Sequence, residues 1–133
     1  MGVIIDTSEI ISLERNRHEV DELVRGREDE PFGISVVTVA ELLHGVERAD
    51  SEARRINRQA FVEKVVEFFP IFVFDVAIAR IYARIWASLA KRSLLVGAHD
   101  LIIAATAISL NYTVITSNIR DYGKIEGLKV ERR

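Results

Sequence analysis

Four short segments of this 133-residue chain carry acidic or amide side chains where a β-like run gives way to a helix-like pattern. These side chains belong to Asp6, Glu41, Asp100, Asn118 and Asp121. In an open α/β sheet the carboxyl ends of adjacent strands share one crevice, so we expect them to meet there. Two carboxylates about 4 Å apart repel by roughly 4 kcal/mol at an effective dielectric near 20, so a cluster stays ionised mainly when a cation neutralises it. Oxygen ligands of this kind favour Mg²⁺ or Mn²⁺ over zinc.

Each acid also has a simpler explanation when it is considered alone. Asp6 could cap a helix that follows the first strand. Glu41 fits an S/T-x-x-E capping box with Thr38, which would place it in a first helical turn. Asp100 would be stabilised by the dipole of the helix that it opens. Asn118 and Asp121 suit a helix cap and the first turn that follows it. Because an acid recurs at every principal junction, a shared site remains the stronger interpretation.

The pattern of apolar residues predicts strands that alternate with helices. Strands are expected at 3–5, 34–37, 71–74 and 113–115, with an edge strand at 128–130. Helices are expected after residue 6 and at 18–25, 38–48, 51–69, 76–91, 98–110 and 118–122. This alternation favours a mainly parallel sheet with helices on its faces, connected by right-handed crossovers.

Composition limits the possible classes of protein. The chain is 49% apolar and fits one domain spanning residues 1–133. Its net charge of −2 argues against a simple cationic binder of nucleic acid, and the lack of cysteine rules out disulfides and thiolate metal sites. The most apolar stretch, 101–110, is shorter than the ~20 residues of a membrane span. An acid at position 6 comes too early for a signal peptide. We therefore expect a soluble, cytoplasmic protein with no membrane partner.

Four motifs in order give the chain a family resemblance. They are "VIIDTSEII", "TVAELLHGV", "HDLIIAATA" and "VITSNIRDYGKIEGLKV". In sequence and spacing they resemble the motifs of the PIN-domain ribonucleases, and most closely the VapC-type toxins of toxin–antitoxin pairs. No single motif is very specific, but four in order at this spacing are, and the resemblance extends over nearly the whole chain.

This resemblance implies a PIN-like three-layer α/β/α sandwich around a sheet of four to five strands. It implies an endoribonuclease that hydrolyses RNA phosphodiester bonds with a water activated by Mg²⁺ or Mn²⁺. The implied catalytic residues are Asp6, Glu41, Asp100 and Asp121, and the metal ligands are these four and Asn118. A homodimer and a cognate antitoxin that fills the active-site groove are also implied. Asn118 stands where the family often has Asp, which leaves the number of metal ions open.

Several other residues are candidates for supporting roles. Thr7 and Thr116 could hold a water molecule or a carboxylate through their hydroxyl groups. Arg120, Lys91 and Arg92 are candidates for contacts with RNA phosphates, and Arg120 is nearest to the acids in sequence. His99 is adjacent to Asp100, but neighbouring positions on a helix point apart, so no role is assigned to it.

Two alternatives belong to other functional classes. A receiver-like phosphoacceptor domain has a similar length and strand-end acids, but it needs an acidic pair after the first strand and a lysine after the last. Asp6 has no acidic neighbour, and Lys124 is misplaced for that role. An inert PIN-like module that only binds RNA or protein is suggested by Asn118 alone.

Overall fold

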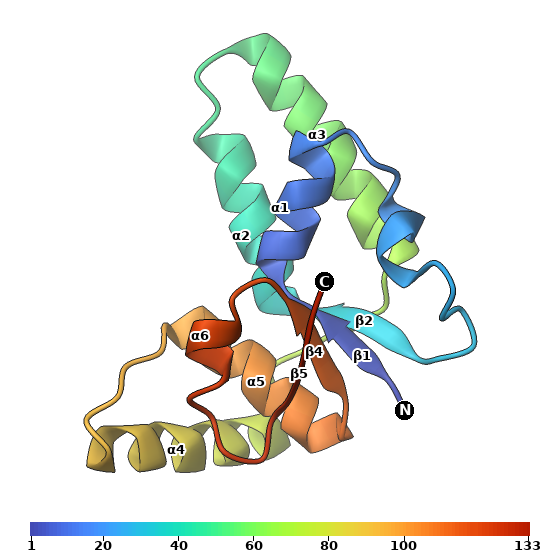
Figure 1. The fold of residues 1–133 in the computed structure, drawn as a ribbon. Coiled ribbons are helices and arrows are strands. Elements are labelled where there is room, and N and C mark those ends of the chain that lie inside the picture. The colour runs from blue at the N-terminus through green and yellow to red at the C-terminus, as the bar shows by residue number, and fades with distance from the viewer.

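A five-stranded parallel sheet lies at the centre of the fold (Figure 1). The computed structural model describes residues 1–133. The strands are β1 (Val3–Ile5), β2 (Phe32–Ser35), β3 (Ile71–Phe72), β4 (Thr113–Thr116) and β5 (Lys129–Arg132). Their order is β3-β2-β1-β4-β5, and every neighbouring pair is parallel. This order differs from the 2-1-3-4-5 order of the receiver-like alternative.

Helices cover both faces of the sheet. They are α1 (Thr7–Arg15), the 3-10 helix η1 (Val20–Val24), α2 (Val36–Glu47), α3 (Glu52–Phe68), α4 (Val76–Lys91), α5 (Ala98–Leu110) and the short α6 (Ile119–Tyr122). Val3 and Ile5 pack toward α1, α2 and α3, whereas Ile4 packs toward α4, α5 and α6. This alternation follows from the two-residue period of a strand. The predicted three-layer α/β/α sandwich is therefore confirmed.

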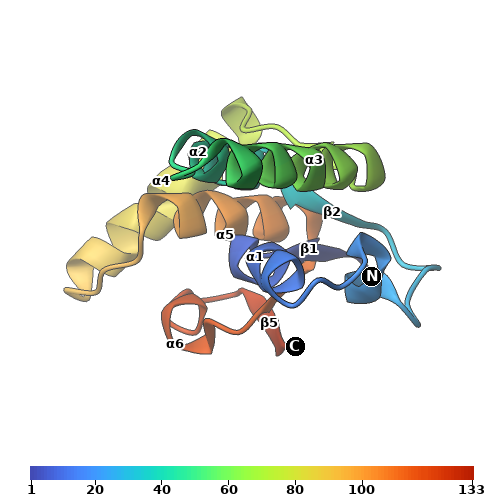
Figure 2. The same cartoon turned by 90° about the horizontal axis from the view of Figure 1, so that it is seen from above.

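The two helical layers have different shapes. Figures 1 and 2 show α2 and α3 lying side by side, and in Figure 1 this pair extends away from the sheet together with α1. On the other face, α5 lies against the sheet, and its residues 103–105 and 107 are fully buried. No helix in the chain combines the length and the apolar character that a membrane crossing requires.

Most predicted elements are confirmed, but the start of α2 is not where the sequence pattern put it. The structure has α4 and α5 at the predicted residues 76–91 and 98–110. β2 ends at Ser35, whose hydroxyl caps α2 by accepting a hydrogen bond from the Val37 amide at 3.1 Å. The predicted strand 34–37 and the Thr38–Glu41 capping box are thus wrong. Glu41 lies in the second turn of α2, so helix capping does not explain its presence.

Candidate metal-dependent active site

Asp6 lies between β1 and α1, at the carboxyl end of the sheet. Its backbone occupies the N-cap position of α1, but its side chain makes no capping hydrogen bond. Instead, Oδ2 accepts hydrogen bonds from Ser8 Oγ at 2.7 Å and Thr116 Oγ1 at 2.8 Å, and Oδ1 accepts one from the Tyr122 hydroxyl at 2.8 Å. Three hydroxyl donors therefore fix this carboxylate, which is 3% exposed. Thr116, a predicted supporting residue, therefore contacts Asp6 directly, and its role stays a prediction.

Tyr122 connects Asp6 to Asp100, which lies in the first turn of α5. The Tyr122 hydroxyl is 2.8 Å from Asp6 Oδ1 and 3.3 Å from Asp100 Oδ1. Burial and these two carboxylates raise the pKa of the Tyr122 phenol far above its usual range, so the hydroxyl remains a donor. Because it has one hydrogen, it can donate fully to only one carboxylate at a time. Two acids from distant parts of the chain thus face the same buried hydroxyl.

The negative charge of this pair is not compensated by a basic side chain. Burial raises the pKa of Asp100 to about 6, and the charge of Asp6 adds to the increase. Glu41 and Asp121 raise it further, whereas the Tyr122 hydrogen bond opposes the change. Neither Asp6 nor Asp100 forms an ion pair with lysine or arginine. The acids predicted to meet are therefore close enough to interact electrostatically.

Glu41 projects from α2 at the edge of the same crevice. Its Oε1 accepts a hydrogen bond from Thr7 Oγ1 at 2.8 Å, and the Thr38 hydroxyl lies 2.9 Å from the Thr7 oxygen. Its Oε2 is 3.7 Å from His99 Nδ1. Thr7, for which a supporting role was predicted, thus contacts a carboxylate directly. His99, to which no role was assigned, lies beside the same acid.

Asp121 is close to the other acids but has its own cationic partner. Its Oδ1 accepts a hydrogen bond from Lys124 Nζ at 3.1 Å, and its Oδ2 accepts one from Asn118 Nδ2 at 3.3 Å. The Lys124 and Asn118 contacts hold the pKa of Asp121 below its usual range. The Asn118 amide N–H donates to Thr116 Oγ1 at 2.9 Å. Asn118 thus links Asp121 to Thr116, which contacts Asp6. The negative charge of Asp121 is balanced by the Lys124 ammonium.

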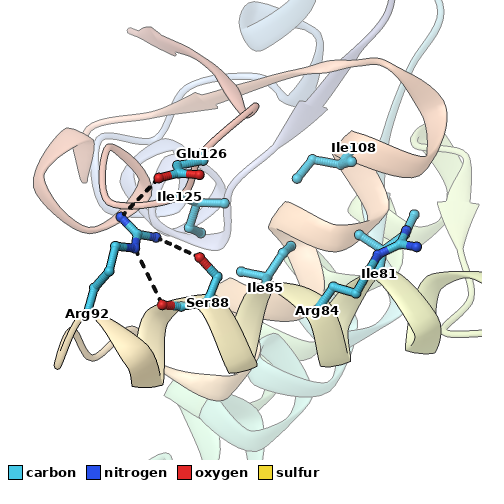
Figure 3. A pocket seen from close by; sticks show the side chains of 8 residues that line it. All are labelled: Ile81, Arg84, Ile85, Ser88, Arg92, Ile108, Ile125 and Glu126. Atoms are coloured by element: carbon cyan, nitrogen blue, oxygen red, sulfur yellow. Dashed lines mark hydrogen bonds and ion pairs between the residues drawn. The ribbon is translucent and has the colours of Figure 1, made fainter.

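The predicted RNA-contacting cations differ in their surroundings. Arg120 is exposed on α6, and Lys91 is exposed at the end of α4. Arg92 is engaged within the protein: its guanidinium contacts the Ser88 carbonyl and hydroxyl and lies 3.9 Å from Glu126 (Figure 3). The hollow drawn in Figure 3 is lined by Arg92 and none of the predicted catalytic carboxylates. Arg120 is therefore the cation beside the site whose side chain has no polar partner in the protein.

The donor atoms of the crevice fit a hard divalent cation in their chemistry. Asp6, Glu41 and Asp100 offer carboxylate oxygens, the ligands preferred by Mg²⁺ and Mn²⁺. Burial first, and then the neighbouring acids, raise the pKa of Asp100, and a bound cation would favour its ionised form. No three His, Asp or Glu side chains lie close enough together to hold an ion without moving.

Sequence reasoning missed two hydroxyl groups that organise the site. Ser8 donates to Asp6 from the first turn of α1, and Tyr122 donates from α6. Ser8 follows Asp6 by two residues, a spacing at which short polar side chains bond locally, and this signal was available. Tyr122 directly follows Asp121 in the sequence, but its orientation depends on how α6 packs. No local pattern predicts that contact.

Comparison with known proteins identifies the class to which this fold and crevice belong. The family described as the PIN domain matches residues 3–127, and the chain therefore belongs to the PIN-domain family. Within it, the chain is 41% identical over 133 residues to "Ribonuclease VapC1" of Rickettsia felis, covering 98% of this chain and 95% of that protein. The predicted family and its ribonuclease class are thus confirmed.

Two further relatives are similar over most of the chain. The "tRNA(fMet)-specific endonuclease VapC" of Salmonella typhimurium is 32% identical over 98 residues, which cover 74% of this chain and 72% of that protein. A crystal structure of DNA-bound VapBC from Salmonella typhimurium superimposes with a TM-score of 0.87 at 28% identity, covering 99% of this chain and 98% of that chain. The PIN-domain match, like the strand order, excludes the receiver-like alternative.

Proposed function

We propose that this chain is a Mg²⁺- or Mn²⁺-dependent endoribonuclease and the toxin of a toxin–antitoxin pair, acting as one domain over residues 1–133. The observation that carries the proposal is the pair Asp6 and Asp100, which faces one buried hydroxyl and has no basic partner. A structural ion pair would pair these acids with lysine or arginine. An unbalanced pair at the carboxyl edge of a parallel sheet is instead typical of a ligand site.

The carboxylates have distinct roles in this proposal. Asp6, Asp100 and Glu41 would hold the metal, and the hydroxyls of Ser8, Thr116 and Tyr122 fix the orientation of Asp6 beforehand. When bound, Mg²⁺ or Mn²⁺ would polarise the attacking water and neutralise charge on the phosphate oxygens. The side chain of Glu41 is 34% exposed, so Glu41 would be the ligand on the solvent side of the site. The predicted roles of Asn118 and Asp121 as ligands stay predictions.

The RNA substrate would approach across the exposed edge of the crevice. Arg120 lies beside Asp121 and is free to contact a phosphate, which supports the role predicted for it. Lys91 is also exposed, whereas Arg92 already binds groups of the protein. One relative is named as a tRNA(fMet)-specific endonuclease, so tRNA is the first substrate class to test.

The proposed protein partners are a cognate antitoxin and a second copy of the chain. The antitoxin is supported by the similarity to a VapBC complex. The homodimer is supported by apolar side chains left exposed on one part of the surface, where Trp86 and Leu95 are 61% and 86% exposed. Both lie on the rim of a hollow lined entirely by hydrophobic residues. A cytoplasmic location stays a prediction.

A cleavage assay with defined ions tests the proposed activity. Purified protein is incubated with total tRNA in the presence of Mg²⁺, Mn²⁺ or a chelator, and the new RNA ends are mapped. We expect discrete cleavage with either ion and none with the chelator. Cleavage that is undiminished by the chelator would contradict the metal-dependent reaction. Binding of tRNA without cleavage under every condition would favour the inert RNA-binding module.

A further inference from the structure

Lys124 contacts Asp121 in the crevice and also the segment between α4 and α5. Its ammonium donates to Asp121 Oδ1 and to the backbone carbonyl of Leu95, each at 3.1 Å. The side chains of Lys124 and Asp121 are 26% and 35% exposed, so the pair is partly shielded from solvent. An ion pair in such surroundings is screened less than one at the open surface. Lys124 is therefore a fixed positive charge at the edge of the site.

The backbone on which Lys124 is carried is also held in place. Arg92 Nη2 donates to the carbonyl oxygen of Lys124 at 3.0 Å, and the same guanidinium contacts Ser88 and Glu126. Figure 3 shows Arg92 reaching from α4 toward the segment that contains Glu126. Lys124 is thus restrained at its backbone by Arg92 and at its ammonium by Leu95. The ammonium can move away from Asp121 only if its hydrogen bond to Leu95 breaks or the segment that contains Lys124 shifts.

The side of the crevice near Asp121 consequently has little capacity left for a cation. One oxygen of Asp121 binds the ammonium of Lys124, and the other accepts a hydrogen bond from Asn118. Asn118 is neutral and contributes no charge. A divalent ion bound to Asp121 would lie close to the lysine charge, and like charges at such distances repel strongly. Asp6 and Asp100 have no lysine or arginine partner, and the basic group paired with Glu41 is the His99 imidazole, 3.7 Å away.

We propose that the site binds one divalent ion, on the side of Asp6 and Asp100, and that Lys124 prevents a second ion from binding near Asp121. This inference rests on the proposed metal-dependent function and specifies its metal stoichiometry. The four carboxylates and the ammonium together carry three negative charges. One divalent ion neutralises two of them, whereas two ions would reverse the sign of the site before RNA arrives.

The test counts bound Mn²⁺ ions by calorimetry and by the loss of the electron paramagnetic resonance signal of free Mn²⁺. Wild type is compared with Lys124→Met and with Lys124→Gln, which keeps a polar end without the charge. Lys129→Met is the matched control, because Lys129 Nζ also donates to one side-chain oxygen, that of Asn111, but lies at the amino end of β5. Circular dichroism identifies the variants that are folded.

We expect one Mn²⁺ per chain in wild type and in Lys129→Met. The folded Lys124 variants should bind two, with an affinity for the second ion at least about tenfold higher than in wild type. Two ions in wild type would overturn the inference, as would a single ion in a folded Lys124 variant. No binding to wild type would instead remove the metal site of the proposed function, an outcome that this count distinguishes from the other two.

Discussion

The Asp6–Asp100 pair and Asp121 have opposite electrostatic surroundings in the same crevice. Asp6 and Asp100 share the Tyr122 hydroxyl, and burial together with their mutual repulsion raises the pKa of Asp100 to about 6. Asp121 binds Lys124 and Asn118, and those contacts lower its pKa. The acids are near neighbours in space, yet only Asp121 is balanced by a positive charge that belongs to the protein.

This difference distinguishes a charge pair that stabilises the fold from a carboxylate pair whose charge would be neutralised by a ligand. The Asp121–Lys124 contact is complete without any added ion, and it also connects α6 to the segment before α5 through Leu95. The Asp6–Asp100 pair is unfavourable by itself when both acids are ionised. A neutral substitution in the Asp6–Asp100 pair should therefore lower RNA cleavage and raise the free energy of unfolding of the metal-free protein.

The largest expected effect comes from Asp100→Asn. The variant removes one negative charge from the unbalanced pair, and we expect RNA cleavage to fall by more than about 100-fold because a proposed metal ligand is lost. The metal-free variant should nevertheless be more stable than wild type at neutral pH. The gain should be on the order of 1 kcal/mol once the partial exposure of Asp100 is allowed for. Cleavage rates and denaturant unfolding check the two outcomes.

Asp50→Asn is the matched control for that substitution. Asp50 forms an exposed ion pair with Arg54, so Asp50→Asn should change neither the cleavage rate nor the stability appreciably. Full cleavage activity in Asp100→Asn would remove the role assigned to this acid. A loss of stability in place of a gain would show that its charge is compensated in a way that the described contacts do not provide.

A smaller effect is expected from Tyr122→Phe, which keeps the ring and removes the hydroxyl that joins the two acids. We expect Mn²⁺ affinity to fall about tenfold, since partners that orient metal ligands typically contribute 10- to 100-fold. Calorimetry with Mn²⁺ checks this value. Tyr112→Phe is the control, because the Tyr112 ring packs on Phe72 and its hydroxyl makes no hydrogen bond within the protein. Equal affinities in the two variants would show that the Tyr122 hydroxyl does not position the ligands.

The smallest effect concerns the pH dependence of stability. The pKa of Asp100 is about 6 in the folded chain and 3.8 for the ordinary group. The folded state therefore holds this proton more strongly than the unfolded state. The resulting stabilisation is complete below the ordinary pKa and is lost as pH rises through about 6. In metal-free protein, the melting temperature of wild type should fall relative to Asp100→Asn between about pH 4 and about pH 6.5, the interval in which the unfolded chain has lost this proton and the folded chain still holds it. Melting temperatures of the two proteins that change in parallel with pH would contradict the raised pKa of Asp100.

The sequence was sufficient to predict most of the fold because its apolar periodicity is strong. The bounds of α4 and α5 follow from sustained patterns that end at polar residues or glycine. The start of α2 was predicted two residues too late, because Thr38 and Glu41 have the spacing of a capping box, whereas Ser35 is the true cap. Several residues in that region suit a helix start, and only tertiary packing distinguishes them.

The sequence predicted the acids of the candidate site but not how their charges are compensated. The strand-end rule placed Asp6, Glu41, Asp100 and Asp121 in one crevice without any knowledge of side-chain contacts. The shared hydroxyl of Tyr122 and the Lys124 ammonium could not be predicted. Both contacts depend on the orientation of α6 and of the chain that follows it. Charge compensation is a property of three-dimensional neighbours, and sequence spacing does not report it.

The most direct test of the unbalanced pair is a comparison of Mn²⁺ binding to Asp100→Asn and Asp121→Asn under identical conditions. Both variants lose one negative charge from the same crevice, so a purely global effect of charge would weaken both equally. The structure predicts that Asp100→Asn loses measurable binding, whereas Asp121→Asn retains it within about tenfold. Equal losses in the two variants, or a greater loss in Asp121→Asn, would contradict the assignment of the metal site to Asp6 and Asp100.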